Sequence, residues 1–206
     1  VADQHGEMRT IEDPYAFPSL FSEYDLYLHG EGKHFRAYER LGAHLRTISG
    51  VSGVNFAVWA PNAVSVSVVG DFNHWDDRRN FLRHHFANGI WELFVPGVGP
   101  GDLYKYRIQT RDGQMLEKAD PYAFGAEVPP HSASVVRDLS RYEWNDGVWL
   151  QRRRETNFLH QPISIYEVHL GSWQRSEGAW LGYRELAHRL VDYCRRMNFT
   201  HLELLP

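Results

Sequence analysis

The stretch that decides the fold runs Val54-Asn-Phe-Ala-Val-Trp-Ala-Pro-Asn-Ala-Val-Ser-Val-Ser-Val68. In its first half, Val54, Phe56 and Val58 occupy every second position, and valines do the same after the Pro61-Asn62 pair. Period-two alternation on both sides of a turn is typical of two half-buried strands. A strand with a single apolar face needs a second sheet to cover it, so the stretch predicts two sheets packed face to face.

The same alternation recurs further along the chain. It is present over residues 91–95 and 104–108, and a further short strand is expected at 132–136. Asp112-Gly113 supplies a turn signal after the second of these runs. Short strands at this spacing indicate an antiparallel arrangement. We therefore predict a mainly β protein, with an immunoglobulin-like β-sandwich over residues 51–137.

The residues before the sandwich divide into two parts. Residues 19–50 read as a helical connector, because an apolar helical face starting at Leu20 and Phe21 is ended by Gly30. Residues 5–17 match residues 112–124 at seven of 13 positions, both ending in Asp-Pro-Tyr-Ala-Phe. The repeat predicts that residues 1–18 are the tail of a preceding related β-module cut off upstream. Chance similarity between two turn-rich segments is the alternative.

The sequence changes character after the sandwich. Residues 138–161 are polar, carry the triplet Arg152-Arg-Arg154, and read as a linker. Residues 162–206 predict a strand over 163–170, a helix over 183–197 with apolar residues at helical spacing, and a strand over 199–205. Such a βαβ unit makes its two strands parallel. A two-stranded parallel sheet with one helix cannot bury both faces, so we expect the rest of an α/β domain beyond Pro206.

Composition excludes several classes of function. The net charge of −4 gives no basic surface for nucleic acid. The single cysteine, Cys194, rules out an internal disulfide, and no apolar run approaches the roughly 18 residues that a membrane span needs. The 12 histidines lack metal-ligand spacing. We therefore expect no metal and no cofactor in a soluble, cytoplasmic protein.

Several stretches, taken in order, resemble the glycogen branching enzymes of the α-amylase superfamily. They include Phe56-Ala-Val-Trp-Ala-Pro-Asn-Ala63, Val68-Val-Gly-Asp-Phe-Asn-His-Trp75, Lys118-Ala-Asp-Pro-Tyr-Ala123 and Tyr166-Glu-Val-His-Leu-Gly-Ser-Trp173. The sandwich alone also resembles modules of debranching enzymes, trehalose-forming hydrolases and kinase-associated glycogen-binding subunits. Residues 166–173 favour branching enzymes. The resemblance covers nearly the whole chain and identifies it as an N-terminal segment, with 162–206 as the start of a catalytic (β/α)8 barrel.

The resemblance implies a retaining transglycosylase in glycogen biosynthesis. Such an enzyme cleaves an α-1,4-glucan, holds the chain as a covalent glycosyl-enzyme, and passes it to a 6-hydroxyl to form an α-1,6 branch. The two carboxyl groups that this chemistry needs lie in the family on later barrel strands. No catalytic residue is therefore assigned here, and the segment alone is expected to be inactive. The full-length enzyme is expected to be a monomer that binds glycogen and amylose-like chains. The alternatives are a stand-alone glucan-binding module and a debranching enzyme.

The resemblance also suggests two substrate-binding residues. In glycogen-binding modules of this type, a Trp after the Asn-x-Trp turn and a Lys on a later strand contact glucan, and Trp75 and Lys105 match them. A second Trp expected further on is absent, with Met115 nearby. Alternatively, Trp75 packs under its turn or against the barrel, and Lys105 is a solvated strand residue. Trp59 and Trp91 are expected to be core or domain-interface rings. Structural roles are expected for Glu167 and Glu203, with His169 as a hydrogen-bond partner.

Overall fold

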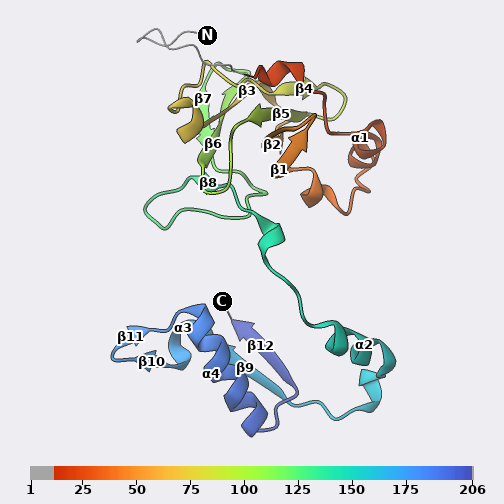
Figure 1. Ribbon diagram of the computed structural model, residues 1–206, viewed down its shortest axis with the longest axis vertical. Coiled ribbons are helices and arrows are strands. Elements are labelled where there is room, and N and C mark those ends of the chain that lie inside the picture. Colours follow the sequence, from red (N-terminus) through yellow and green to blue (C-terminus); the bar gives the residue numbers. More distant parts are fainter. Residues whose placement is uncertain (1–11, 206) are drawn as a thin grey trace. The chain divides into compact units, whose positions relative to one another are not determined.

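The computed structural model describes residues 12–205, which divide into two compact units, residues 12–142 and 143–205 (Figure 1). None of the helices in residues 12–205 has the length and apolar character that a bilayer crossing requires. Within the same residues, His, Cys, Asp and Glu side chains nowhere gather in threes as a metal site would need.

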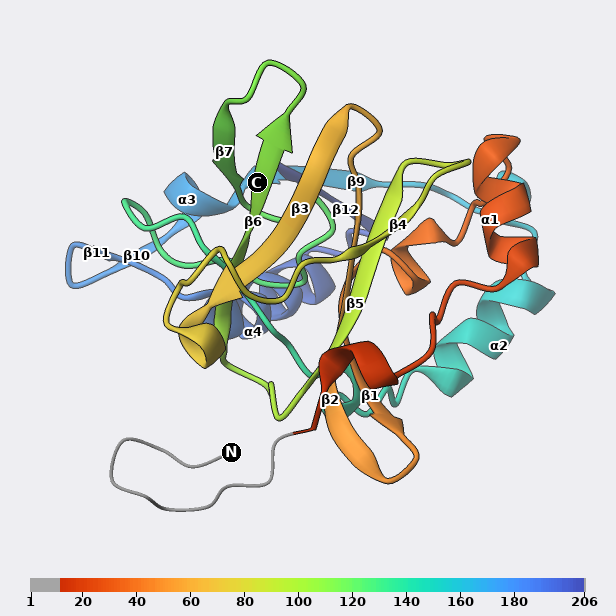
Figure 2. The same ribbon diagram turned by 90° about the horizontal axis from the view of Figure 1, so that it is seen from above.

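The first unit is a β-sandwich, as the alternation predicted. One sheet has the order β1 (Gly42–Ile48), β2 (Val51–Trp59), β5 (Ile90–Pro96) and β4 (Arg83–His85). The other has the order β3 (Ala63–Gly70), β6 (Leu103–Thr110) and β7 (Met115–Lys118), and β8 (Ser134–Val135) also pairs with β6. Every pairing in both sheets is antiparallel. Figure 2 shows β3 of one sheet and β5 of the other.

The alternating apolar residues form the core between the two sheets. Phe56 of β2 is fully buried, and its ring packs against Phe72 and Tyr104 with centroids 5.7 and 4.9 Å apart. The core also contains Val54, Val58, Val66, Val68, Trp91, Leu93, Val95 and Tyr106. Burial of these apolar side chains is the main stabilising contribution to the sandwich. Trp91 is buried there, as expected, whereas Trp59 is not.

The connector begins as expected but is shorter than predicted. It contains the helix α1 (Glu23–Gly30) and the 3₁₀-helix η2 (Ala37–Glu39), and the 3₁₀-helix η1 (Pro14–Ala16) lies just before it. Its predicted end at residue 50 is wrong, because β1 is the first strand of the sandwich. Ala43 and Leu45 face the core, and the strand joins β2 through Ser49-Gly50, whose φ angles are both positive. Two residues with positive φ make the type of hairpin turn that matches strand twist.

The connector covers the outer face of the β1-β2-β5-β4 sheet. Phe21 and Leu41 pack there against Ala57 and Ile90 of the sheet. The ring of Phe17 contacts Phe94 edge-on, with centroids 4.7 Å apart. Because these side chains are buried, the connector is part of the folded unit.

The predicted repeat is only partly within the described residues, since residues 1–11 lie outside them. In the part that is described, Asp13 and Asp120 form the same local turn. Each carboxylate accepts a hydrogen bond from the backbone N–H two residues on, at 2.9 Å from Tyr15 and 2.8 Å from Tyr122. The two Asp-Pro-Tyr-Ala-Phe segments therefore share one turn geometry. That residues 1–18 belong to a preceding module stays a prediction.

Asp25 gives the connector a pH-dependent contribution to stability. It closes a capping box with Ser22 at the start of α1 and contacts His34 and Arg40 at 3.1 Å each. Burial raises the pKa of Asp25, but the hydrogen bonds from Ser22, Arg40 and His34 outweigh it and lower the pKa to about 2. A pKa below the ordinary value of 3.8 means that the ionised group stabilises the fold. This contribution is complete above that value and declines as the pH falls towards 2.

We expect Asp25→Asn to lower the free energy of unfolding by about 2 kcal/mol at pH 7. Most of that difference in free energy should vanish by pH 2.5, because the Asp25 carboxylate of the unfolded parent chain is then protonated and that of the folded chain is partly protonated. Urea unfolding at both pH values measures it, with Glu31→Gln as an exposed control. An equal difference between parent and Asp25→Asn at both pH values would contradict the assignment.

The second unit contains the predicted βαβ arrangement. The strands β9 (Ile165–His169) and β12 (His201–Leu205) pair in parallel, and α4 (Tyr183–Arg196) connects them. Between β9 and α4 lie α3 (Leu170–Trp173), β10 (Arg175–Ser176) and β11 (Ala179–Trp180). Leu186, Leu190 and Cys194 of α4 pack on Val168, so Cys194 is a core residue, as predicted. The Arg152-Arg-Arg154 triplet lies in a helix, α2 (Gly147–Glu155), which corrects the expected irregular linker.

Candidate functional site

The Trp75 side chain is held by a tight turn after β3. The turn contains η3 (Asp71–Asn73) and then His74 and Trp75, both with positive φ. The buried Asn73 amide donates to the Val68 carbonyl and accepts from the Gly70 N–H, both at 2.9 Å. These bonds account for the Asn of the Gly-Asp-Phe-Asn-x-Trp pattern, because its side chain satisfies backbone groups of a sharp reversal.

The indole ring of Trp75 is fixed and also accessible to solvent. Its backbone N–H donates to the Gly70 carbonyl at 2.9 Å, and its Nε1–H donates to Asp71 Oδ1 at 3.1 Å. The residue nevertheless remains 39% exposed. Trp75 is therefore hydrogen-bonded to its turn but not buried beneath it. A flat ring held in one orientation at the surface can stack against the apolar face of a ligand.

Lys105 lies on β6 in a row of charged side chains. It faces outward beside Val69, and its Nζ donates to Glu117 Oε1 of β7 at 2.9 Å. Arg107, two residues along, contacts Glu117 at 3.3 Å and Asp77 at 3.0 Å. The hydrogen bond from Lys105 is the main reason that the pKa of Glu117 lies below its ordinary value. Lys105 is thus a paired group whose side chain is only 19% exposed.

Asp71 connects the two predicted site residues. One of its carboxylate oxygens accepts from the Trp75 indole, and the other accepts from the Leu103 N–H at 3.3 Å, two residues before Lys105. Trp75 and Lys105 therefore lie at the same end of the β3-β6-β7 sheet, where Gly70 pairs with Tyr104. Met115 pairs with Gln109, towards the other end of β6, and is exposed. An exposed ring beside hydrogen-bonding charged groups can bind a hydroxyl-rich ligand.

Asp71, Asp77 and Glu117 were not predicted from the sequence. A signal for Glu117 existed, because a hairpin turn at Asp112-Gly113 places residues 107 and 117 opposite each other. Asp71 has no such signal, since its role depends on how the turn folds back on β6. Neither the contact of Trp75 with glucan nor that of Lys105 is tested by this geometry, and both stay predictions.

Glu167 and Glu203 of the second unit lie on neighbouring strands, and the hydrogen bond of His169 goes to a serine. Glu167 and Glu203 are register partners on the parallel strands β9 and β12. His169 Nδ1 lies 2.8 Å from Ser172 Oγ in α3, so the histidine hydrogen-bonds to its own following turn. The structure therefore gives His169 a different partner from the expected glutamate.

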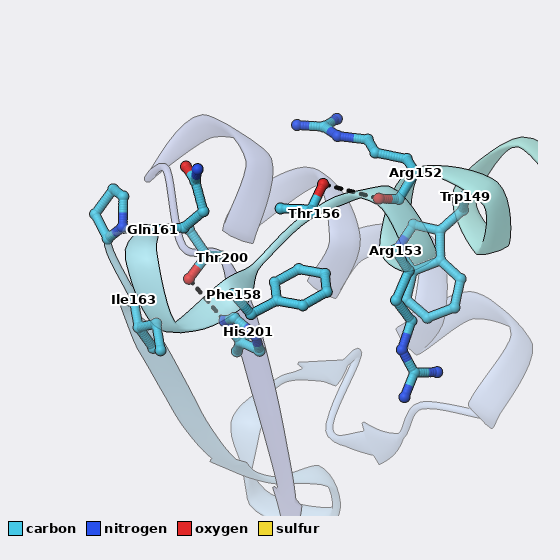
Figure 3. Close-up of a pocket in the computed structure, with 10 residues that line it drawn as sticks. Trp149, Arg152, Arg153, Thr156, Phe158, Gln161, Ile163, Thr200 and His201 are labelled. Carbon is cyan, nitrogen blue, oxygen red and sulfur yellow. Dashed lines mark hydrogen bonds between the residues drawn. The ribbon is translucent and has the colours of Figure 1, made fainter.

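A groove of about 760 Å³ lies at the start of the strands in the second unit (Figure 3). Trp149 and Arg153 of α2 form one side, and Ile163 and His201 are on the other (Figure 3). The Arg153 guanidinium is 5.4 Å from the Trp149 ring centre. In the (β/α)8 barrel that the sequence predicts, sites would form at the opposite, carboxyl ends of the strands. This groove is therefore not favoured as a catalytic site, despite its size.

Comparisons with known proteins bear on both units. Residues 40–123 match the family model "Carbohydrate-binding module 48 (Isoamylase N-terminal domain)". The chain is 56% identical over 207 residues to the 1,4-alpha-glucan branching enzyme GlgB of Rhodopirellula baltica, covering 99% of this chain and 28% of that protein. It is 57% identical over 198 residues to the Rubrobacter xylanophilus enzyme of the same name, covering 95% and 27%. The chain thus spans less than a third of the length of these relatives.

A solved structure agrees on the fold. The apo pullulanase of Klebsiella pneumoniae superposes with a TM-score of 0.58 at 24% sequence identity, covering 83% of this chain and 20% of that one. At this identity the match supports the architecture and carries no statement about activity.

Proposed function

We propose that this chain, which is similar to 1,4-alpha-glucan branching enzymes over nearly its full length, is a segment of such an enzyme. The identity of 56% over 99% of the chain carries the proposal, and the expected family resemblance is confirmed by it. In the full-length protein, the activity is cleavage of α-1,4-glucan chains and their transfer to form α-1,6 branches. The resemblance also implies a cytoplasmic, monomeric enzyme, and both properties belong to the proposal.

In this proposal the segment is accessory, and the catalytic groups lie elsewhere in the full-length protein. Residues 51–137, extended to include β1, form the glucan-associated module, 138–161 link it, and 162–206 begin a (β/α)8 barrel. Support comes from the parallel pairing of β9 and β12 and from the exposure of Ile165, Leu202 and Leu204 on them. Parallel strands are normally covered on both faces. Further barrel strands and helices would cover these side chains.

Glu167 and Glu203 have a structural role in this scheme. Both alternate along their strands with Val168 and Leu204, and Val168 packs on α4. Because successive side chains of a strand point to opposite faces, Glu167 points away from α4. In a barrel that direction is the interior, where a carboxylate needs hydrogen-bond partners from neighbouring strands.

The surface around Trp75 and Lys105 is the proposed glucan contact of the module. The exposed indole face offers a stacking platform for a pyranose ring, and Lys105 and Glu117 offer a donor and an acceptor for sugar hydroxyls. Met115 replaces a second aromatic platform, so one ring carries most of the stacking. Binding at this surface is therefore expected in the millimolar range, as for a single stacking contact.

We expect maltoheptaose to shift the backbone amide resonances of residues 103–107 and 117 in a titration followed by NMR. Trp75→Ala should weaken binding at this surface about tenfold, since it removes the stacking ring. Trp149→Ala, an exposed tryptophan of the second unit, is the matched control and should leave these shifts unchanged. Absence of any shift in the parent chain at millimolar sugar would exclude the surface as a glucan contact.

The two alternative functions differ from branching in what the full-length protein does to a glucan. A stand-alone glucan-binding module would bind maltoheptaose, and its full-length protein would leave amylose unchanged. A debranching enzyme would release linear chains from a branched glucan. A branching enzyme would create new α-1,6 linkages in amylose. Product analysis with the full-length protein therefore separates the three.

A further inference from the structure

Trp59 occupies an unexpected position, on the outer face of the sandwich. It is the last residue of β2, and 54% of it is exposed. Its indole Nε1–H donates to the Asn88 carbonyl at 3.0 Å, in the loop between β4 and β5. The His29 ring of α1 contacts it edge-on, with centroids 6.1 Å apart. The indole is therefore fixed at its polar edge and open on its apolar surface.

Asn88 joins Trp59 to a neighbouring groove between α1 and the β4–β5 loop. Its side-chain amide donates to the Leu26 carbonyl of α1 at 2.8 Å, which holds the loop against the helix. A Cβ at Gly30 would approach the Asn88 side-chain oxygen to 3.2 Å, so a small residue favours this approach. Figure 2 shows the β4–β5 loop reaching towards α1. The helix and the loop thus form one continuous surface with Trp59.

The groove has the composition of a sugar site. Its volume is about 600 Å³, and its lining includes Tyr27, Phe86, Glu23, Glu31 and Asn88. Tyr27 is 60% exposed, and Phe86 is also exposed. Exposed rings accompanied by carboxylates fit a neutral ligand with many hydroxyl groups. The carboxylates of Glu23 and Glu31 oppose an anionic ligand such as a phosphate, and Glu31 is the partner of Lys33.

The Trp59 surface is separate from the surface at Trp75. Trp59 ends β2, next to the turn into β3, whereas Trp75 follows the far end of β3. The eight residues of β3 span roughly 25 Å. Trp59 belongs to the β1-β2-β5-β4 sheet, whereas Trp75 lies in the turn that follows β3 of the other sheet. One short oligosaccharide therefore cannot account for both.

We propose that Trp59 and Tyr27, with the groove beside them, form a second binding surface for an α-1,4-glucan chain. The proposal rests on the proposed function only for the choice of glucan as ligand. Trp59 supplies the stacking face, and Tyr27 supplies a second ring in the groove that Asn88 also lines. Glu23 and Glu31 accept hydrogen bonds from sugar hydroxyls. With two such surfaces, one module can hold two strands of a glucan, or one long strand twice.

The test uses the 206-residue chain carrying 5-fluorotryptophan, titrated with maltoheptaose and followed by fluorine NMR. Trp59→Phe and Trp75→Phe assign the two resonances. We expect the Trp59 signal to shift both in the parent and in a Trp75→Ala variant. Tyr27→Ala should weaken the response at Trp59 about tenfold and leave Trp75 unchanged. Tyr24→Ala, an exposed tyrosine of α1 outside the groove, is the matched control.

The outcomes are distinguishable. A Trp59 signal that stays still while the Trp75 signal shifts overturns the second surface and leaves the proposed function standing. A Trp59 response that disappears in Trp75→Ala also overturns it, because the shift would then come from the other surface. Two silent signals at millimolar sugar contradict both surfaces. Equal loss in Tyr24→Ala and Tyr27→Ala would contradict the assignment to the groove.

Discussion

Glu92→Ala is expected to lower the free energy of unfolding of the sandwich by about 4 kcal/mol. Glu92 lies on the outer face of β5 and is 1% exposed. Its carboxylate accepts from Ser19 Oγ and from the Leu20 and Phe21 N–H groups, and it contacts His85 at 2.9 Å. Burial raises the pKa of Glu92, but the hydrogen bonds from His85, Ser19 and Phe21 outweigh it and leave the pKa below its ordinary value. Alanine would leave these buried donors without an acceptor.

Two variants separate this mechanism from general damage. Glu92→Gln keeps an acceptor of the same shape and should cost about 1–2 kcal/mol, through loss of the charge-assisted bonds. Glu117→Ala, in a more exposed ion pair, should cost less than about 1 kcal/mol. Urea unfolding measures all three. Hydrogen exchange should show the largest increase in residues 19–30, since Glu92 holds the connector on the sheet. A Glu92→Ala variant as stable as Glu117→Ala would disprove the role of this carboxylate.

The second large effect concerns activity, and it follows from what the segment contains. Retaining transglycosylation needs two carboxyl groups about 5 Å apart, flanking the scissile bond. Glu167 and Glu203 are the middle residues of the two described parallel strands, whereas active sites in barrels form at the carboxyl ends of the strands. We therefore expect no branching by the 206-residue chain, and full activity only when the downstream barrel strands are present.

The strands show most clearly which parts of the fold the sequence predicts. Val54, Phe56 and Val58 predicted β2 because strict alternation has one structural meaning. The same parity places Trp59 on the outer face, yet a tryptophan favours a buried assignment from its type alone. The alternation along the strand predicted the burial of these two residues better than residue type did, since Trp59 is half exposed and Trp91, on the inner face, is buried. For these two tryptophans, the position along the strand decided the exposure of the side chain more than its hydrophobicity did.

Burial of Glu92 could not be predicted from its neighbours. It alternates with Trp91 and Leu93, so the pattern assigns it to the solvent face. In the structure that face is covered by the connector, which is more than 70 residues away in the sequence. A contact of this kind depends on tertiary packing and has no local signal. The same holds for Asp71, which bridges Trp75 and the start of β6.

The predicted start of the sandwich at residue 51 missed β1 for a local reason. Gly42 precedes a run in which Ala43 and Leu45 alternate with His44 and Arg46, too short and too polar to outweigh the helical signals before it. The Ser49-Gly50 turn was the available clue, because a two-residue turn with a glycine favours a hairpin. In the candidate site, the alternation along the strand places Lys105 on the outer face. It does not predict which residue of β7 lies beside Lys105, so the pairing with Glu117 could not be predicted.

The most direct measurement of the account is the number of α-1,6 linkages formed in amylose, counted by proton NMR after incubation with the 206-residue chain and, separately, with the full-length protein. We expect no new linkages with the chain alone and a steady increase with the full-length protein. A full-length protein that forms no α-1,6 linkages, or that only releases linear chains from a branched glucan, would contradict it. So would branching by the 206-residue chain alone, because the catalytic carboxyls would then have to lie within it.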